Sequence, residues 1–269
     1  MDPQESSVRI TEAYRKIGTV QEKLYPIRFY SPFIDRIFLE PGVESPRLTD
    51  PKNHKGIRIG LHHYGTEEND YARGAFSLYV PETYDDTIEW PLLVALHGGS
   101  GHGRSFIWMW LREARSNGMI LLSPTSLDRT WSILEPETDG EALFSILDFI
   151  DRHYNIDMNR ILITGFSDGG TFALMYALQE RTPFTAFAPI SCMLPAFEIQ
   201  FTKERRIYWI HGAMDWMFPV RYAEEGCKVL KEAQADVTLR VIDDLSHTYP
   251  REENTRILKW FDPELSSPA

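Results

Sequence analysis

Short apolar runs alternate with longer amphipathic segments from residue 90 to the end of the chain. Apolar runs of about four to eight residues predict buried strands, and apolar residues that recur every three or four positions predict helices. The predicted strands are 91–96, 119–123, 160–164, 184–190, 206–210 and 237–242. The predicted helices are 104–117, 140–154, 169–180, 221–235 and 252–261. Because strands that are apolar on both faces are typical of parallel sheets covered by helices, this order predicts an α/β fold with a mostly parallel central sheet flanked by helices.

The beginning of the chain follows a different pattern. Residues 8–24 carry charges between apolar positions near helical spacing, and these positions are Ile10, Tyr14, Ile17 and Leu24. This spacing predicts an amphipathic helix whose apolar face must be covered. We expect the helix to pack against the rest of the protein, or against a second copy of the chain in a homo-oligomer. Residues 25–55 are rich in proline and aromatic residues and predict irregular structure.

Two further apolar runs precede the regular alternation. Residues 57–63 and 74–80 predict two strands, which we interpret as an antiparallel pair joined through residues 65–69. We therefore divide the chain into an N-terminal extension of helical and irregular structure, residues 1–55, and one α/β domain, residues 56–269.

The charge and the cysteines narrow the classes of partner. The net charge of −11, without a cluster of Lys and Arg, argues against nucleic acid or an anionic membrane as the main partner. Cys192 and Cys227 lack the spacing of a zinc site or of a disulfide framework, so no metal site is predicted. The N-terminal residues do not resemble a signal peptide, and no apolar run has membrane-spanning length. We expect a soluble cytoplasmic protein.

Residues 161–170, ILITGFSDGG, predict a strand that turns sharply into a helix with Ser167 at the apex. Only very small residues fit two positions before and after that serine, where the two backbones nearly touch, and Gly165 and Gly169 stand there. Such a turn exposes the hydroxyl above the sheet and places the positive end of the helix behind it. The GxSxG pattern alone is weak, but here the flanking strand and helix are predicted independently. Ser167 is therefore a candidate nucleophile.

A serine hydroxyl needs a base to accept its proton, and the base needs a carboxylate to orient it. Asp215 follows the strand predicted over residues 206–210, and His247 follows the strand predicted over residues 237–242. The order Ser167, Asp215, His247 is the order expected in an α/β-hydrolase. We interpret these residues as a catalytic triad.

Other acids and histidines fit these roles less well. Asp243 and Asp244 are too close to the proposed base in sequence to be preferred as the acid. His97 and His211 each precede a glycine at the end of a strand and are expected to brace their loops. His102 comes too early in the chain for the expected order.

A tetrahedral intermediate also needs two donors for its oxyanion. The backbone N–H of Asp168, directly after the serine, is one candidate. The other is expected from the loop at residues 97–103, which has four glycines within six residues and can approach a ligand closely. Gly99 is the preferred donor there, and Gly98 is the alternative.

With these residues in place, the sequence resembles the α/β-hydrolase superfamily, and within it the phospholipase/carboxylesterase and dienelactone-hydrolase-like serine esterases. The matching segments are LHGGSGHG at 96–103, GFSDGG at 165–170, HGAMDWMFP at 211–219 and LSHTYP at 245–250. The resemblance implies an α/β-hydrolase fold and hydrolysis of carboxylic esters, or of thioesters, without a metal or organic cofactor. It extends from residue 90 to the C-terminus and assigns no role to the first 55 residues or so.

The substrate is predicted only coarsely. Aromatic residues near the proposed site suit a small or medium acyl or aryl group, and Trp131, Phe166, Trp216 and Phe218 are the candidates for the pocket lining. The same fold leaves two alternatives. A serine peptidase of the prolyl-oligopeptidase type has similar motifs, but 269 residues leave no room for its usual gating domain. A binding protein without catalysis is disfavoured because all three triad candidates are present.

Overall fold

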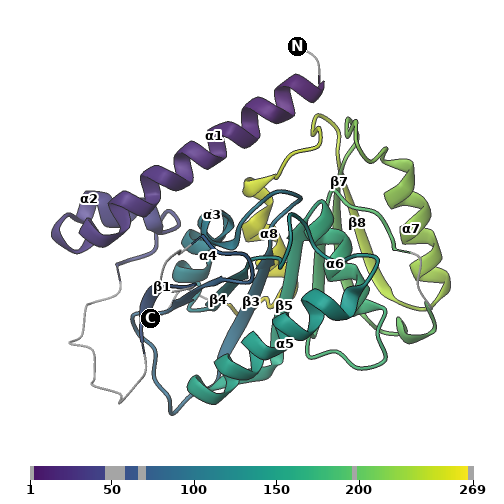
Figure 1. Ribbon diagram of the computed structural model, residues 1–269. Helices are drawn as coiled ribbons and strands as arrows, with labels where there is room; N and C mark the ends of the chain where they lie inside the picture. Colours follow the sequence, from purple (N-terminus) through teal and green to yellow (C-terminus); the bar gives the residue numbers. More distant parts are fainter. Residues whose placement is uncertain (1–2, 46–57, 66–70, 196–198, 266–269) are drawn as a thin grey trace.

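An eight-stranded sheet forms the centre of the molecule, with the strand order β1-β2-β4-β3-β5-β6-β7-β8 (Figure 1). The computed structural model describes residues 3–45, 58–65, 71–195 and 199–265. The strands are β1 Gly60–Tyr64, β2 Phe76–Val80, β3 Trp90–Leu96, β4 Ile120–Pro124, β5 Ile156–Phe166, β6 Ala186–Ile190, β7 Arg206–Gly212 and β8 Asp236–Ile242. β2 pairs antiparallel with both β1 and β4, and all other neighbours are parallel. The predicted mostly parallel sheet is confirmed.

Helices cover both faces of the sheet, and the alternation of side chains along β3 shows which helices belong to each face. Leu92, Val94 and Leu96 share one apolar core with the helices α5 and α6, whereas Leu93 and Ala95 share the other core with α4 and α8 (Figure 1). The helices of the α/β domain are α3 Gly103–Phe106, α4 Leu111–Ser116, α5 Pro136–His153, α6 Asp168–Ala177, α7 Arg221–Glu232 and α8 Asn254–Phe261. Because both faces are covered, β3 and β4 are buried along their whole length.

The helix predicted over residues 104–117 is broken. α3 is followed by a 3₁₀ turn at Ile107–Met109, and α4 begins only at Leu111. In a continuous α-helix, side chains two positions apart point to different faces. The tighter turn changes these directions, and Trp108 and Trp110 are both buried in the same core. The break in the helix thus accompanies the packing of both indoles into one core. Helical periodicity could not predict it.

The N-terminal extension begins with the long helix α1, Pro3–Leu24, which confirms the predicted helix. The predicted apolar face is wrong in part, because Ile10 and Ile17 are exposed and the buried positions of α1 are Ser7, Gly18 and Gln21. The prediction of irregular structure after it is wrong for residues 25–38, which form the short helical segments η1 Tyr25–Tyr30, α2 Pro32–Asp35 and η2 Arg36–Phe38. η1 and α2 each have a proline in the first helical turn, where its fixed φ is favourable and its missing N–H costs nothing. Residues 46–57 lie outside the described residues, and so does the domain boundary predicted between residues 55 and 56. Residues 66–69 of the predicted turn also lie outside them.

Buried charges attach η1 and α2 to the α/β domain. The carboxylate of Glu82, just after β2, pairs with Arg28 of η1 at 2.8 Å and with Arg115 of α4 at 3.3 Å. Arg115 also pairs with Asp35 of α2 at 2.8 Å, and the Tyr79 hydroxyl donates to Glu82 at 2.6 Å. Burial alone would raise the pKa of Glu82, but Arg115, Tyr79 and Arg28 outweigh it, and the pKa is lowered. The carboxylate is therefore held charged by its partners.

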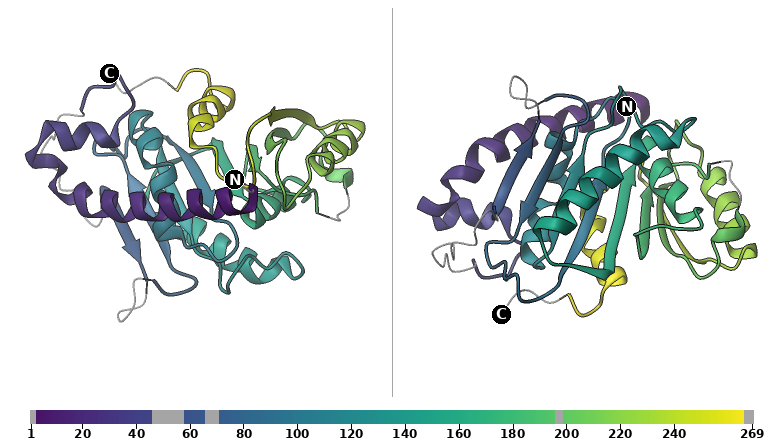
Figure 2. Two further views of the ribbon diagram at one scale, coloured as in Figure 1. Left: turned by 90° about the horizontal axis from the view of Figure 1, so that it is seen from above. Right: turned by 60° about the horizontal axis from the view of Figure 1, so that its bottom comes forward.

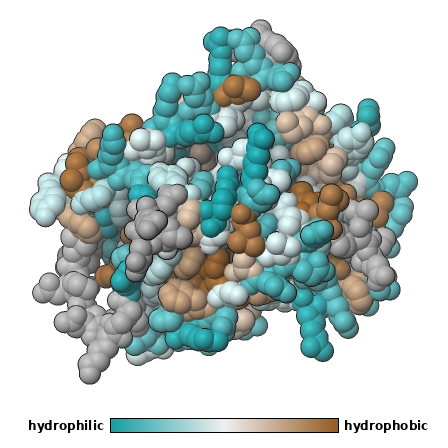
Figure 3. Space-filling model, in the orientation of Figure 1, coloured by the Kyte–Doolittle hydropathy of each residue, from teal (hydrophilic) through white to brown (hydrophobic). Residues whose placement is uncertain are grey.

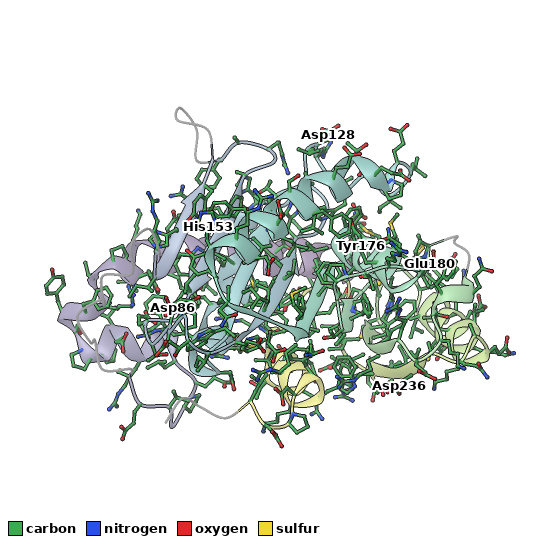
Figure 4. The ribbon with its side chains drawn as sticks, turned by 90° about the horizontal axis from the view of Figure 1, so that it is seen from below. Asp86, Asp128, His153, Tyr176, Glu180 and Asp236 are labelled. Carbon is green, nitrogen blue, oxygen red and sulfur yellow. The ribbon has the colours of Figure 1, made fainter. Side chains whose placement is uncertain are left out.

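α1 crosses the molecule above the sheet, with its N-terminal end near the loops that follow β7 and β8 (Figure 2). Hydrophilic side chains cover much of the face shown in Figure 3, with smaller apolar patches between them. The edge of the sheet opposite α1 carries exposed acidic side chains, including Asp86, Glu180 and Asp236 (Figure 4). Among the described helices, none combines the length and the hydropathy needed to cross a membrane.

We predict that Glu82→Gln lowers the free energy of unfolding by about 3–5 kcal/mol at pH 7, because the buried guanidinium group of Arg28 loses its carboxylate partner and that of Arg115 keeps only Asp35. The pKa of Glu82 is lower in the folded protein than in the unfolded chain. This stabilisation is therefore present above the ordinary carboxyl pKa and is lost as the pH falls through the lowered value. Urea denaturation at neutral and acid pH measures the difference. The matched control is Glu89→Gln at an exposed position, and equal stability of the two variants at pH 7 would contradict the prediction.

Candidate active site

The predicted strand–turn–helix is present, with Ser167 between the end of β5 and the start of α6. Ser167 has φ +54° and ψ −119°, a backbone conformation that residues other than glycine rarely adopt. A Cβ atom on Gly165 would lie 2.2 Å from the carbonyl oxygen of Gly169, and a Cβ atom on Gly169 would lie 2.4 Å from that of His97. The strand, the helix and the loop after β3 thus approach so closely that only glycine fits at both positions. This contact holds the serine at the carboxyl edge of the sheet.

Ser167, His247 and Asp215 come together from the loops after β5, β8 and β7. His247 Nε2 lies 3.1 Å from Ser167 Oγ, and His247 Nδ1 lies 2.8 Å from Asp215 Oδ2. Since a carboxylate only accepts hydrogen bonds, Nδ1 carries the proton and Nε2 can accept the serine hydroxyl. All three side chains are buried. The arrangement can activate a hydroxyl nucleophile.

The loop after β7 fixes the carboxylate of Asp215. Its Oδ1 accepts hydrogen bonds from the backbone N–H groups of Met217 and Phe218, at 2.9 and 2.8 Å, which leaves Oδ2 directed at the imidazole. His211 Nε2 donates to the carbonyl oxygen of Phe218 at 2.7 Å and braces the same loop, as predicted. Burial lowers the pKa of His211, so this histidine stays neutral.

His97 braces the glycine loop after β3, as predicted. Its Nδ1 donates to the carbonyl oxygen of Gly98 at 2.7 Å, and its Nε2 accepts from the backbone N–H of Ser126 at 3.1 Å. Burial lowers the pKa of His97 to about 4, although the hydrogen bond to Gly98 opposes this effect. A neutral imidazole therefore links the loops after β3 and β4.

Gly99 and Asp168, the two candidates for oxyanion donors, are neighbours. A Cβ atom on Gly99 would lie 2.7 Å from Asp168 Oδ2. The hydroxyl of Thr130 donates to the same carboxylate oxygen at 2.6 Å. Asp168 is also the first residue of α6, where backbone N–H groups and the helix dipole favour negative charge. The structure thus places Asp168 directly after the serine, on a helix end suited to an anion, with Gly99 of the neighbouring loop close to its carboxylate.

Three of the four predicted pocket aromatics surround the imidazole of His247. The rings of Phe166, Phe218 and Trp216 have centroids 5.1, 5.3 and 6.2 Å from it. The prediction for Trp131 is wrong.

The ring of Trp131 lies in the core, where it stacks on Phe172 with centroids 5.1 Å apart. Its indole N–H donates to the carbonyl oxygen of His97 at 2.7 Å. With its indole N–H bonded to the glycine loop and its ring in the core, Trp131 supports the loop and does not line the pocket.

Sequence reasoning missed several residues beside the site. Tyr249, two positions after His247, is buried between the rings of Phe106 and Phe166, and its hydroxyl donates to Asn254. Its only sequence signal is its place within the motif LSHTYP. No motif or spacing in the sequence places Thr130 or the residues of α1 near the site. Within the described part of the chain, no group of three or more His, Cys, Asp or Glu side chains could hold a metal ion.

Comparison with known proteins identifies related sequences. A family model described as Phospholipase/Carboxylesterase matches residues 140–262, a segment that includes the serine, acid and histidine. The chain is 28% identical over 196 residues to the bifunctional acetylxylan esterase/xylanase XynS20E of Neocallimastix patriciarum, covering 69% of this chain and 28% of that protein. It is 29% identical over 132 residues to acyl-protein thioesterase 1 of Mycosarcoma maydis, covering 47% of this chain and 51% of that protein. The chain thus spans no more than about half the length of either relative.

Solved structures show the same fold. The crystal structure of a thermostable esterase superposes with a TM-score of 0.60 at 23% sequence identity, covering 75% of this chain and 61% of that chain. At this identity the likeness establishes the shared architecture of the sheet and its helices.

We predict that the free energy of unfolding of His97→Gln falls less steeply than that of the wild type as the pH decreases. The pKa of His97 is about 4 in the folded protein and near 6.5 in the unfolded chain. As the pH falls from 6.5 to 4, the unfolded chain takes up a proton that the folded protein does not, and His97 contributes a loss of up to about 1.4 kcal/mol per pH unit. Urea denaturation between pH 7 and pH 4.5 compares wild type with His97→Gln. The control is His153→Gln, at an exposed position on α5 (Figure 4). If the free energy of unfolding depends on pH identically in wild type and His97→Gln, the prediction is wrong.

Proposed function

Because the chain belongs to the α/β-hydrolase superfamily, with residues 140–262 matching the phospholipase/carboxylesterase family, we propose that it hydrolyses carboxylic esters through an acyl-enzyme intermediate. The observation that carries the proposal is the hydrogen-bonded line from Ser167 through His247 to Asp215. In this proposal residues 56–269 form the catalytic domain, and residues 1–55 form an extension packed on it.

The mechanism follows from the roles that each group can take. Ser167 Oγ attacks the ester carbonyl while His247 Nε2 accepts its proton, and Asp215 stabilises the imidazolium that forms. The carbonyl oxygen becomes an oxyanion, for which the backbone N–H groups of Gly99 and Asp168 are the proposed donors. Collapse of the intermediate expels the alcohol, which takes the proton from His247. Water activated by the same imidazole then hydrolyses the acyl-serine and regenerates the free hydroxyl.

The surroundings of the triad favour charge in the transition state. Each oxyanion donor contributes about 3–4 kcal/mol in enzymes of this kind, because it is already oriented before the charge forms. The N-terminus of α6 adds a positive potential behind Ser167. Asp215 is buried and keeps two backbone donors, so its carboxylate stays oriented as the imidazole gains and loses its proton.

The substrate class is an ester of a small or medium acyl or aryl group. The two curated relatives are named for acting on acetyl esters of xylan and on acyl-protein thioesters. Both reactions transfer an acyl group, and the serine chemistry proposed here suits either an oxygen or a sulfur leaving group. The rings of Phe166, Trp216 and Phe218 around His247 provide apolar surface for such a group.

We predict that Ser167→Ala lowers kcat for p-nitrophenyl acetate by at least about 10³-fold, because the nucleophile is absent and only binding and oxyanion stabilisation remain. Initial rates at saturating ester measure the effect. The matched control is Ser145→Ala on the exposed side of α5, which should keep the wild-type rate. Equal rates for wild type and Ser167→Ala would remove the serine from the mechanism, and a wild type that cleaves peptide amides but no ester would favour a peptidase.

A further inference from the structure

α1 crosses beside the proposed active site and is attached near both of its ends. Close to its start, Ser7 Oγ lies 3.0 Å from Ser246 Oγ and accepts a hydrogen bond from Trp216 Nε1 at 3.2 Å. Ser246 and Trp216 are the chain neighbours of the proposed base and acid. Close to its end, Glu22 accepts a hydrogen bond from Arg104 Nε at 2.8 Å. The helix is therefore held in place over the carboxyl edge of the sheet (Figure 2).

The middle of α1 forms one wall of an open cavity against the α/β domain. The cavity has a volume of about 140 Å³, and α1 contributes Thr11, Tyr14 and Arg15 to its wall. The opposite wall includes Gly99, the proposed oxyanion donor, and Phe166, the residue before Ser167, so the cavity borders the proposed oxyanion loop. The three triad residues themselves are not part of its lining. A substrate whose carbonyl occupies the oxyanion site can thus place one of its groups in this cavity.

The size and lining of the cavity define which group it accepts. Phe106, Met109, Phe166 and Tyr249 form most of its apolar wall, and among the described residues no carboxylate lines it. An apolar cavity of about 150 Å³ is known to hold a benzene molecule. The cavity is partly open to solvent, and its inner space suits one aromatic ring or an aliphatic chain of about six carbons, with α1 as one wall.

We propose that α1 is the outer wall of the substrate pocket, and that Thr11 and Tyr14 restrict the enzyme to esters with a compact acyl or aryl group at this position. The inference rests on the proposed ester hydrolysis and adds a specificity role for a helix that lies outside the matched family segment. Tyr14 sets the depth of the pocket, because its ring packs on the core beneath α1. Thr11 is exposed, one helical turn before Tyr14, and sets the width of the opening.

The test measures kcat/KM for two series of esters, p-nitrophenyl esters from acetate to decanoate and acetates of phenol and larger aryl alcohols. Tyr14→Ala should raise the ratio of kcat/KM for a large ester to that for the smallest ester by about tenfold or more, because the wall recedes. Thr11→Phe should lower the same ratio by about tenfold, because its ring enters the opening. The series that responds identifies whether the acyl or the alcohol group occupies the cavity.

The control is Tyr30→Ala, an aromatic residue of the same extension whose side chain is 88% exposed, and both ratios should keep their wild-type values. Thr11→Phe changes an exposed position, so the test stands on this variant even if Tyr14→Ala fails to fold. An active wild type with unchanged ratios in Thr11→Phe and in folded Tyr14→Ala would overturn the role of α1 and leave the proposed hydrolysis intact. A folded wild type that hydrolyses no ester in either series would overturn the proposed hydrolysis itself, and the inference with it.

Discussion

The approach of three backbone segments around Gly165 and Gly169 determines the rest of the site. A side chain at either position would collide with a carbonyl oxygen of α6 or of the loop after β3, at 2.2 and 2.4 Å. With glycine there, β5 can turn directly into α6, and Ser167 takes a conformation with positive φ at the edge of the sheet. The same approach brings the glycine loop next to Asp168. One steric constraint therefore sets both the position of the hydroxyl at the edge of the sheet and the place where an oxyanion would lie.

Three histidines at strand ends show how partners decide the role of one residue type. His97 and His211 each donate to a backbone carbonyl, and burial lowers the pKa of both and keeps them neutral. His247 instead faces the carboxylate of Asp215 and the hydroxyl of Ser167. A carboxylate partner stabilises the protonated ring, which a proton-accepting base requires. His97 and His211 hold their loops in place, whereas His247 can accept and return a proton.

Local patterns in the sequence predicted the parallel strands and indicated Ser167, Asp215 and His247, because each of these residues lies in the connection that follows a strand. Features that depend on distant contacts were not predictable in this way. The indole of Trp131 finds its acceptor at His97, 34 positions away, and so lies in the core. α1 reaches the site through Ser7 and a partner 239 positions along the chain. Periodicity predicted a covered face that includes Ile10 and Ile17, but both are exposed, and the buried positions of the helix include Ser7 and Gln21.

The central claim is that Ser167 is an activated nucleophile. The most direct measurement is covalent labelling of the folded protein with a fluorophosphonate, followed by mass spectrometry of its peptides. We predict one label per chain, on the peptide that contains Ser167, and loss of labelling in His247→Ala because the base that accepts the serine proton is gone. Labelling at another residue, or no labelling of a folded wild-type protein, would contradict it.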